Sequence, residues 1–229
     1  MNKIIVIEGT DCSGKETQSK LLIDRLNSEG INVGYITFPN YDSPTGKIVG
    51  GSYLGKQDKD EFGNKIFPEP VFSEGASNVD PKVSCLYYAA DRLYNIKNIK
   101  ELLKTQNLVF DRYVYSNMAH QGGKISDENE RNKMYEWINK LEFELLELPK
   151  ADIKIFLHMP YEYACELKKN RKYLDQNEID KNHLINAEKA FIEVANKYEF
   201  KIIECVNNNI RTINDINEEI YQYVKSKLK

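Results

Sequence analysis

The residues best suited to chemistry lie near the start of the chain, where a glycine-rich loop ends in a lysine. Residues 9–15 read GTDCSGK and follow an apolar run at 4–7. Glycines at this spacing let backbone N–H groups turn inward around phosphate oxygens, while the lysine reaches the outer phosphates. We therefore expect a nucleoside triphosphate here. The expected contacts are Gly9, Thr10, Asp11, Cys12, Ser13, Gly14, Lys15, Glu16 and Thr17.

One position of this loop departs from the phosphate-binding pattern. The residue after the lysine is Glu16, where a Ser or Thr hydroxyl would hold Mg²⁺, and Thr17 comes one place late. A carboxylate can also coordinate Mg²⁺, but it adds negative charge beside the phosphates. Either Glu16 binds the metal through water or Thr17 takes over.

The elements that must position this loop follow an α/β pattern. Short apolar runs suited to buried parallel strands alternate with segments of helical periodicity. This alternation predicts a five-stranded parallel sheet with helices on both faces. The expected strands are 4–7, 33–38, 108–110, 153–158 and 201–205. The expected helices are 18–29, 45–54, 81–104, 127–148, 161–172, 185–198 and 213–228.

The expected helix 81–104 carries apolar residues at helical spacing, which predicts a core helix. That face consists of Val83, Leu86, Tyr87, Ala90, Leu93, Ile96 and Ile99. The strand that follows ends at Asp111, on the edge of the sheet where open α/β proteins bind ligands. An aspartate at that point can hold Mg²⁺ opposite the phosphate loop.

Composition limits the classes of protein to which the chain can belong. Its 229 residues suit one domain, and a net charge of −3 gives no reason to expect a nucleic acid polymer as partner. Neither a signal peptide nor an apolar run of membrane-spanning length occurs, so we expect a cytoplasmic location. The four cysteines show no C-x-x-C spacing and are expected to be free thiols. A polar stretch at 55–79 is expected to be a surface insertion or a mobile loop.

Four sequence blocks in this order resemble the thymidylate kinases, which are P-loop nucleoside monophosphate kinases. The blocks are IEGTDCSGK at 7–15, FPNYDSPTGK at 38–47, YYAADR at 87–92 and DRYVYSNMAHQGGK at 111–124. The resemblance covers nearly the whole chain. It implies transfer of the γ-phosphoryl group of ATP to thymidine monophosphate (dTMP) with Mg²⁺ as cofactor, mostly by positioning and charge neutralisation.

The resemblance also implies roles for individual residues. Lys15 would take the β- and γ-phosphates, and Arg112 would bind the acceptor phosphate as a bidentate guanidinium can. Asp11 would lie close to the transferred phosphate and to the metal, which makes Asp11, Glu16 and Asp111 the expected metal ligands. The expected acceptor-binding residues are Phe38, Tyr41, Tyr88, Arg92, Arg112, Asn117, His120 and Gln121.

The resemblance implies a separate role for several of these acceptor-binding residues. Tyr88 would stack on the thymine, Asn117 would bond the pyrimidine edge, and Arg92 would reach the base and phosphate side. Tyr41 would lie near the acceptor phosphate or its metal. His120 stands where the family usually has an aromatic ring near the sugar, so the choice of acceptor is open.

The family obtains its transition-state cation either from an arginine inside the phosphate loop or from a basic lid. This loop contains no arginine, so the lid at about 166–182 is expected to supply the charge. Its basic cluster is Lys168, Lys169, Arg171 and Lys172. Arg171, the only arginine in the cluster, is the expected transition-state contact and completes the catalytic set Asp11, Lys15, Arg112 and Arg171.

Two other functions fit the same residues. His120 and the insertion favour a kinase for another deoxynucleotide or a deoxynucleoside, while Glu16 alone favours a nucleotide-binding protein without turnover. A GTP-binding switch is disfavoured because no N-K-x-D motif occurs. By analogy with the family we also expect a homodimer, for which the apolar face of the helix 81–104 could serve, although packing in the core explains the same face equally well.

Overall fold

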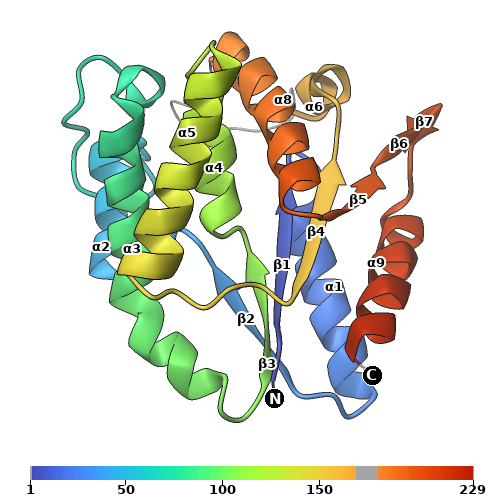
Figure 1. Cartoon of the computed structure of the whole chain (residues 1–229). Helices are drawn as coiled ribbons and strands as arrows, with labels where there is room; N and C mark the ends of the chain where they lie inside the picture. The colour runs from blue at the N-terminus through green and yellow to red at the C-terminus, as the bar shows by residue number, and fades with distance from the viewer. Residues whose placement is uncertain (1, 169–179, 229) are drawn as a thin grey trace.

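The computed structural model describes residues 2–168 and 180–228, which form a parallel sheet between two layers of helices (Figure 1). The sheet has five strands in the order β2-β3-β1-β4-β5, and every neighbouring pair is parallel. This confirms the predicted fold class. The strands are β1 Ile4–Gly9, β2 Val33–Thr37, β3 Asn107–Asp111, β4 Ile153–His158 and β5 Lys201–Glu204. A small antiparallel hairpin, β6 Val206–Asn207 with β7 Asn209–Ile210, follows.

Alternate residues of β1 face the two layers. Ile5 and Ile7 pack on the side of α1 and α9, while Ile4 and Val6 face the cluster formed with α3, α4 and α5 (Figure 1). The α-helices are α1 Lys15–Ser28, α2 Pro44–Ile48, α3 Pro81–Leu102, α4 Val114–Gly122, α5 Glu128–Asn139, α6 Tyr161–Lys168, α8 Lys181–Lys197 and α9 Ile213–Leu228. No helix in the described part of the chain is long and apolar enough to cross a membrane.

Two predicted helices change their winding before they end. The expected helix 45–54 is α2 followed by the π-helical turn η1 Val49–Tyr53, and the expected helix 127–148 is α5 followed by the π-helical turn η3 Lys140–Leu145. The helix α4 was not predicted. Nearly all of its residues are buried, so its sequence lacks the polar and apolar alternation that marks a surface helix.

The prediction of the core face of α3 is confirmed for Ile99, which is buried, and for Tyr87 and Ile96, which pack against core clusters, but it is wrong elsewhere. Val83, Leu86 and Leu93 are exposed, and the buried positions include Ser84, Asp91 and Arg92 instead. These polar side chains turn inward because they hydrogen-bond to neighbouring segments, as described below. Val83, Leu86 and Leu93 are left facing outward.

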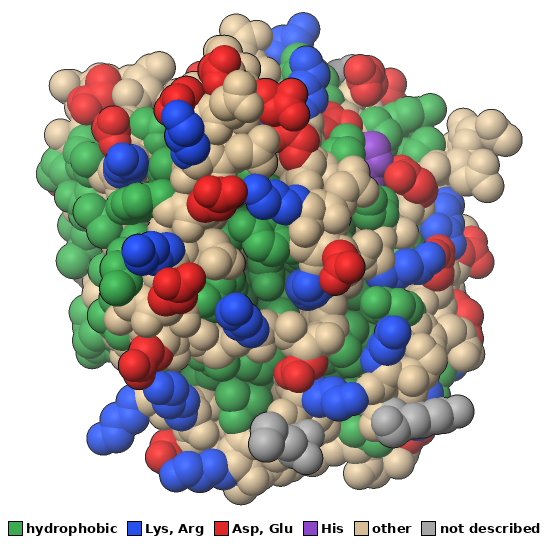
Figure 2. Space-filling view, viewed as in Figure 1, with side chains coloured by type: hydrophobic (Ala, Val, Ile, Leu, Met, Phe, Trp, Pro, Cys, Tyr) green, Lys and Arg blue, Asp and Glu red, His purple; other side chains and the backbone are tan. Residues whose placement is uncertain are grey.

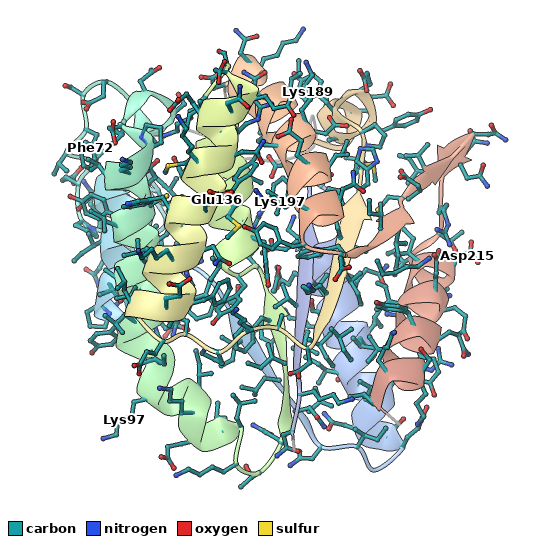
Figure 3. The ribbon with its side chains drawn as sticks, viewed as in Figure 1. Phe72, Lys97, Glu136, Lys189, Lys197 and Asp215 are labelled. Carbon is teal, nitrogen blue, oxygen red and sulfur yellow. The ribbon has the colours of Figure 1, made fainter. Side chains whose placement is uncertain are left out.

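The polar stretch 55–79 has a defined course. Near its middle a tight turn pairs Asp60 with Asn64, and Lys59 with Lys65 across an isolated bridge. Farther on, a single helical turn, η2 Ala76–Asn78, begins at Ala76. Ala76 and Val79 are buried with Tyr53 of η1. The ring of Phe72, labelled in Figure 3, packs edge-on against Tyr53 and Tyr87 of α3.

Lys124, the last residue of the block 111–124, fixes the C-terminal end of the stretch 55–79. Lys124 donates to the carbonyl oxygens of Ala76 and Val79, both at 2.9 Å, and lies 3.2 Å from the hydroxyl of Ser84. An ammonium group that binds two carbonyls replaces the water that they would otherwise bind. The stretch is therefore tied to α3 and to the segment after α4.

Candidate active site

A cleft of about 310 Å³ opens at the carboxyl ends of β1, β2 and β3. These ends meet where the strand order reverses around β1, the usual place for a ligand in an open α/β sheet. Residues from the phosphate loop, from the loop after β2 and from the end of β3 face one another across it. The lining is Cys12, Gly14, Lys15, Glu16, Thr17, Thr37, Phe38, Pro39, Tyr41, Asp111 and Arg112.

The phosphate loop has the compact geometry that its sequence predicts. A Cβ atom at Gly9 would lie 2.5 Å from the hydroxyl of Ser13 and 2.8 Å from the carbonyl of Leu157, so only glycine fits. Gly14 has φ of +77° and stands at the N-cap of α1, where it has no side chain to occupy the helix N–H groups. The positive end of α1 is thus open to an anion. Thr10 anchors the loop to β4 through its hydroxyl, which donates to the carbonyl of Met159 at 2.7 Å.

Lys15 is buried, with 8% of its surface exposed, and donates to the carbonyl of Thr10 at 2.9 Å. Burial and the nearby charge of Arg112 lower the pKa of Lys15 to about 8, although Asp11, Asp111 and Glu8 act in the opposite direction. The protein thus holds an ammonium group at this point at a cost in free energy. A bound phosphate would offset that cost.

Arg112 takes a backbone conformation that is unfavourable for a residue with a side chain. Its φ is +67°, and its N–H donates to the carbonyl of Ile7 on β1 at 3.1 Å. The guanidinium lies 3.6 Å from Asp11 and donates to the hydroxyl of Ser116 at 3.2 Å. This conformation turns the side chain back over the sheet end toward the phosphate loop.

Glu8, at the end of β1, supports the position of Arg112 through Ser116. The sequence analysis missed this residue. Its carboxylate accepts hydrogen bonds from the backbone N–H groups of Tyr113 and Ser116, at 2.8 and 3.0 Å, and from the hydroxyl of Ser116. Burial raises the pKa of Glu8 despite these bonds and the charge of Arg112. Glu8 therefore caps α4 and orients Ser116, which in turn binds Arg112.

Asp11 lies between two cations. Lys168, the last residue of α6, donates to it at 2.7 Å, and Arg112 approaches it from the other side. Burial alone would raise the pKa of Asp11, but the charges of Arg112, Lys168 and Lys15 hold it well below its usual range. Lys168 belongs to the predicted lid cluster. Lys169, Arg171 and Lys172 lie outside the described residues.

The three carboxylates expected around one metal ion do not come together. Asp11 pairs with Lys168, Asp111 accepts a hydrogen bond from the hydroxyl of Tyr35 at 3.0 Å, and the exposed Glu16 pairs with Lys20 at 2.6 Å. No group of three possible metal-ligating side chains occurs within residues 2–168 and 180–228. Asp111 and Glu16 do line the cleft, and Mg²⁺ bound with a nucleotide needs only one or two carboxylates beside the phosphates.

A second group of polar residues is buried between α3, α4 and η3. Arg92 forms a bidentate ion pair with Glu142, and the same carboxylate accepts a hydrogen bond from Asn117 at 3.2 Å. Within the described residues, the Oδ1 atom of Asn117 and both amide atoms of Gln121 are buried without a hydrogen-bond partner. Unpaired buried amides are costly, so these two residues of α4 point to a polar ligand.

The remaining expected acceptor residues take different positions. Tyr88 packs edge-on against Tyr53, with ring centroids 5.6 Å apart. Phe38 is buried against Phe110 and Tyr113, although it also borders the cleft. His120 does not line the cleft.

His120 instead lines a separate pocket with Thr10 and Asp11 of the phosphate loop, and its ring stacks on His183 of α8. The two rings make a contact of 3.3 Å between nitrogens and pack beside Phe191. Burial and the neighbouring imidazole hold the pKa of His120 well below its usual value, and burial with the charge of Lys124 lowers the pKa of His183 to about 4. Both rings are therefore neutral at pH 7.

Asp91 fixes the loop that follows β2 and was also missed in the sequence analysis. It is buried and accepts hydrogen bonds from the backbone N–H of Asn40 at 2.7 Å and from the hydroxyls of Ser43 and Thr45 at 2.7 and 2.8 Å. This loop contains Tyr41, and the Phe38–Pro39 peptide at its start is cis. Asp91 thus connects α3 to the wall of the cleft opposite the phosphate loop.

Comparisons of the chain with a family profile, with relatives and with a solved structure all point to the same family. The family profile described as Thymidylate kinase matches residues 7–69 and 61–220. The chain is 30% identical to the "Probable thymidylate kinase" of Methanocaldococcus jannaschii over 98% of this chain and 97% of the relative. It is 28% identical to the thymidylate kinase of Plasmodium falciparum over 99% and 91% of the two chains. A solved thymidylate kinase structure from Candida albicans covers 98% of this chain and 92% of its own, with a TM-score of 0.71 and 22% identity, which supports the fold.

Replacing Lys15 by Met is expected to stabilise the protein without nucleotide. A shift in the pKa of Lys15 from 10.5 to about 8 corresponds to roughly 3 kcal/mol, and loss of the bond to Thr10 leaves a net gain of about 1–3 kcal/mol. Between about pH 8 and 10.5 the folded wild type releases a proton that the unfolded chain keeps. Wild-type stability therefore rises over this window, and the advantage of the variant disappears.

Urea unfolding from pH 7 to 10 measures this difference. Lys20→Met, at an exposed position on the same helix, is the matched control and should change the free energy of unfolding by less than about 0.5 kcal/mol. A Lys15→Met protein that is less stable than wild type at pH 7 would contradict the account.

Proposed function

The chain belongs to the thymidylate kinase family, and from that premise we propose how its residues transfer the γ-phosphoryl group of ATP to dTMP. The observation that carries the proposal is the shared cleft, in which Lys15 from the phosphate loop faces Arg112 from the end of β3. Phosphoryl transfer requires two polyphosphate ends to be held together with their charges neutralised. Two cations that border one cleft meet that requirement.

On the donor side, the phosphate loop and the open end of α1 would hold the triphosphate of ATP, with Lys15 on the β- and γ-phosphates. Arg112, oriented by Asp11 and Ser116, would bind the acceptor phosphate. Lys168 would move from Asp11 to the transferred group when the phosphates arrive, and Arg171 would join it from the lid at about 166–182. These steps place positive charge where it is needed in the transition state.

On the acceptor side, the base would lie between α3 and α4. The Oδ1 atom of Asn117 and the amide group of Gln121 would supply acceptors and a donor for a pyrimidine edge, and Tyr88 would supply a ring one turn before Arg92 on α3. Arg92 is occupied by Glu142, so we propose that it acts mainly by holding Asn117 in place through that carboxylate.

The residues of the cleft fit a magnesium ion that arrives with ATP. Asp111 and either Glu16 or the hydroxyl of Thr17 would hold it, since all three border the cleft. When bound, the ion would neutralise charge on the β- and γ-phosphates. Asp11 is less suited to this role because Lys168 and Arg112 already engage it.

We further propose that two copies of the chain pair through the outer surface of α3. Val83, Leu86, Leu93 and Tyr94 are exposed there, and Ile48 of the neighbouring α2 is exposed as well. Figure 2 shows apolar side chains gathered at the left edge of the view, over these helices. An apolar surface of this kind is typical of an oligomer interface.

The acceptor is tested by an ADP-release assay with Mg-ATP and a panel of nucleoside monophosphates and nucleosides. Turnover is expected to be highest with dTMP. A clear preference for another monophosphate or for a nucleoside would support a kinase with a different acceptor. ATP binding without ADP release for any acceptor would contradict the kinase.

Replacing Glu16 by Thr is expected to retain kcat or raise it. The change removes a negative charge beside the phosphates, which is worth about 1 kcal/mol for unit charges 4 Å apart in water, so the rise should be at most about fivefold. Steady-state kinetics over a Mg²⁺ titration measures the effect. Thr17→Ala, made in the wild type and in Glu16→Thr, shows whether the metal uses the hydroxyl of Thr17 or the hydroxyl introduced at position 16. Complete loss of activity in Glu16→Thr would mean that the carboxylate is essential.

Replacing Leu86 by Glu is expected to convert the dimer to a monomer, because it places a charge in the centre of the apolar surface of α3. Gel filtration with light scattering should give twice the chain mass for wild type and the chain mass for the variant. Ile210→Glu, on the distant hairpin β6–β7, is the control and should remain a dimer. A monomeric wild type would dispose of the proposal.

A further inference from the structure

The polar stretch 55–79 contacts the candidate active site at Tyr41. From residue 57 to 71 every side chain is exposed except Phe67, which is partly buried. Its ring lies edge-on to Tyr41, with centroids 5.5 Å apart and planes at 82°. Tyr41 lines the same cleft as Lys15 and Arg112.

The neighbouring helical turn has no side chain where Phe67 packs. A Cβ atom at Gly50 would lie 2.6 Å from the ring of Phe67 and 3.1 Å from that of Tyr41, and a Cβ atom at Gly51 would lie 2.2 Å from the carbonyl of Pro68. These two glycines of η1 allow the stretch to approach the backbone directly. The three groups, Gly50, Phe67 and Tyr41, thus meet at one point.

Both ends of the tight turn in this stretch contact the same tyrosine. Lys56 places its ammonium group 4.9 Å from the centre of the Tyr41 ring, and Phe67 meets the ring from the other end of the turn. The turn closes through the bond from the N–H of Ile66 to the carbonyl of Asp58 at 3.1 Å. This closure brings both Lys56 and Phe67 into contact with Tyr41.

We propose that this stretch is part of the acceptor site and that Phe67 is a positioning residue, which holds Tyr41 against the cleft for the acceptor phosphate. The inference depends on the proposed function, since it assigns Tyr41 to the acceptor. It gives the stretch a role in acceptor binding that neither its composition nor its exposure indicates. ATP binding, which takes place on the opposite wall, does not involve it.

Phe67→Ala tests the proposal in steady-state kinetics with dTMP and ATP varied separately. We expect the KM for dTMP to rise by about 2- to 10-fold, the equivalent of one aromatic pair, and the KM for ATP to stay unchanged. Phe62→Ala is the matched control, because Phe62 lies in the same turn with 81% of its surface exposed, and it should leave both constants unchanged. Loss of packing alone would lower the melting temperature or alter both constants together.

A double-mutant cycle with Tyr41→Ala shows whether Phe67 acts through Tyr41. In the Tyr41→Ala background the Phe67→Ala change should have no further effect on the KM for dTMP. An undiminished effect there, or a Phe67→Ala enzyme indistinguishable from wild type, would overturn the inference while the wild-type activity stands. A wild type that fails to phosphorylate any nucleoside monophosphate would overturn the proposed function itself.

Discussion

The site depends on keeping two cations, Lys15 and Arg112, close together in a partly buried cleft. Like charges at short range repel, and burial adds a desolvation cost that is visible in the lowered pKa of Lys15. Asp11 and Asp111 offset part of this cost, but Asp11 is shared with Lys168. Without a ligand, the positive charges of the site are therefore only partly neutralised. Bound phosphates would neutralise the remainder, which favours tight binding of highly charged anions.

Such an arrangement needs a rigid frame, and the sheet supplies it. β1 lies between β3 and β4, so the phosphate loop, Arg112 and Met159 emerge side by side at one edge. Glu8 at the end of β1 fixes the first turn of α4, and through Ser116 it fixes the guanidinium of Arg112. The unfavourable φ of Arg112 is held by this hydrogen-bonded frame, as is common for residues that must point into a site.

The sequence predicted the parts of the molecule that are encoded locally. The phosphate loop, the strands and the last helix depend on neighbouring residues, so their types and spacing sufficed. Glu8, Asp91 and Glu142 could not be found in this way, because their partners lie 105, 51 and 50 residues away. Nothing in a short window distinguishes such a buried carboxylate from a solvated one.

The same dependence on distant partners explains why the core face of α3 was partly mispredicted and why α4 was missed. Their polar residues face inward because other segments supply partners, and hydrophobic periodicity alone interprets a polar residue as exposed. Sequence proximity to the phosphate loop also could not show that Lys168 engages Asp11, one of the three expected metal ligands.

The two walls of the cleft thus differ in how they are built. The donor wall is one continuous loop and helix, in which Gly9, Gly14 and Lys15 carry both the shape and the charge. The wall proposed to bind the acceptor is the loop around Tyr41, which contacts Asp91 through Asn40 and Phe67 through Tyr41 itself. Because its supports come from separate segments, the acceptor wall can change by substitution in those segments while the phosphate loop stays intact. Differences in acceptor choice among related kinases would then be sought first in such supporting residues, outside the motifs that identify the family.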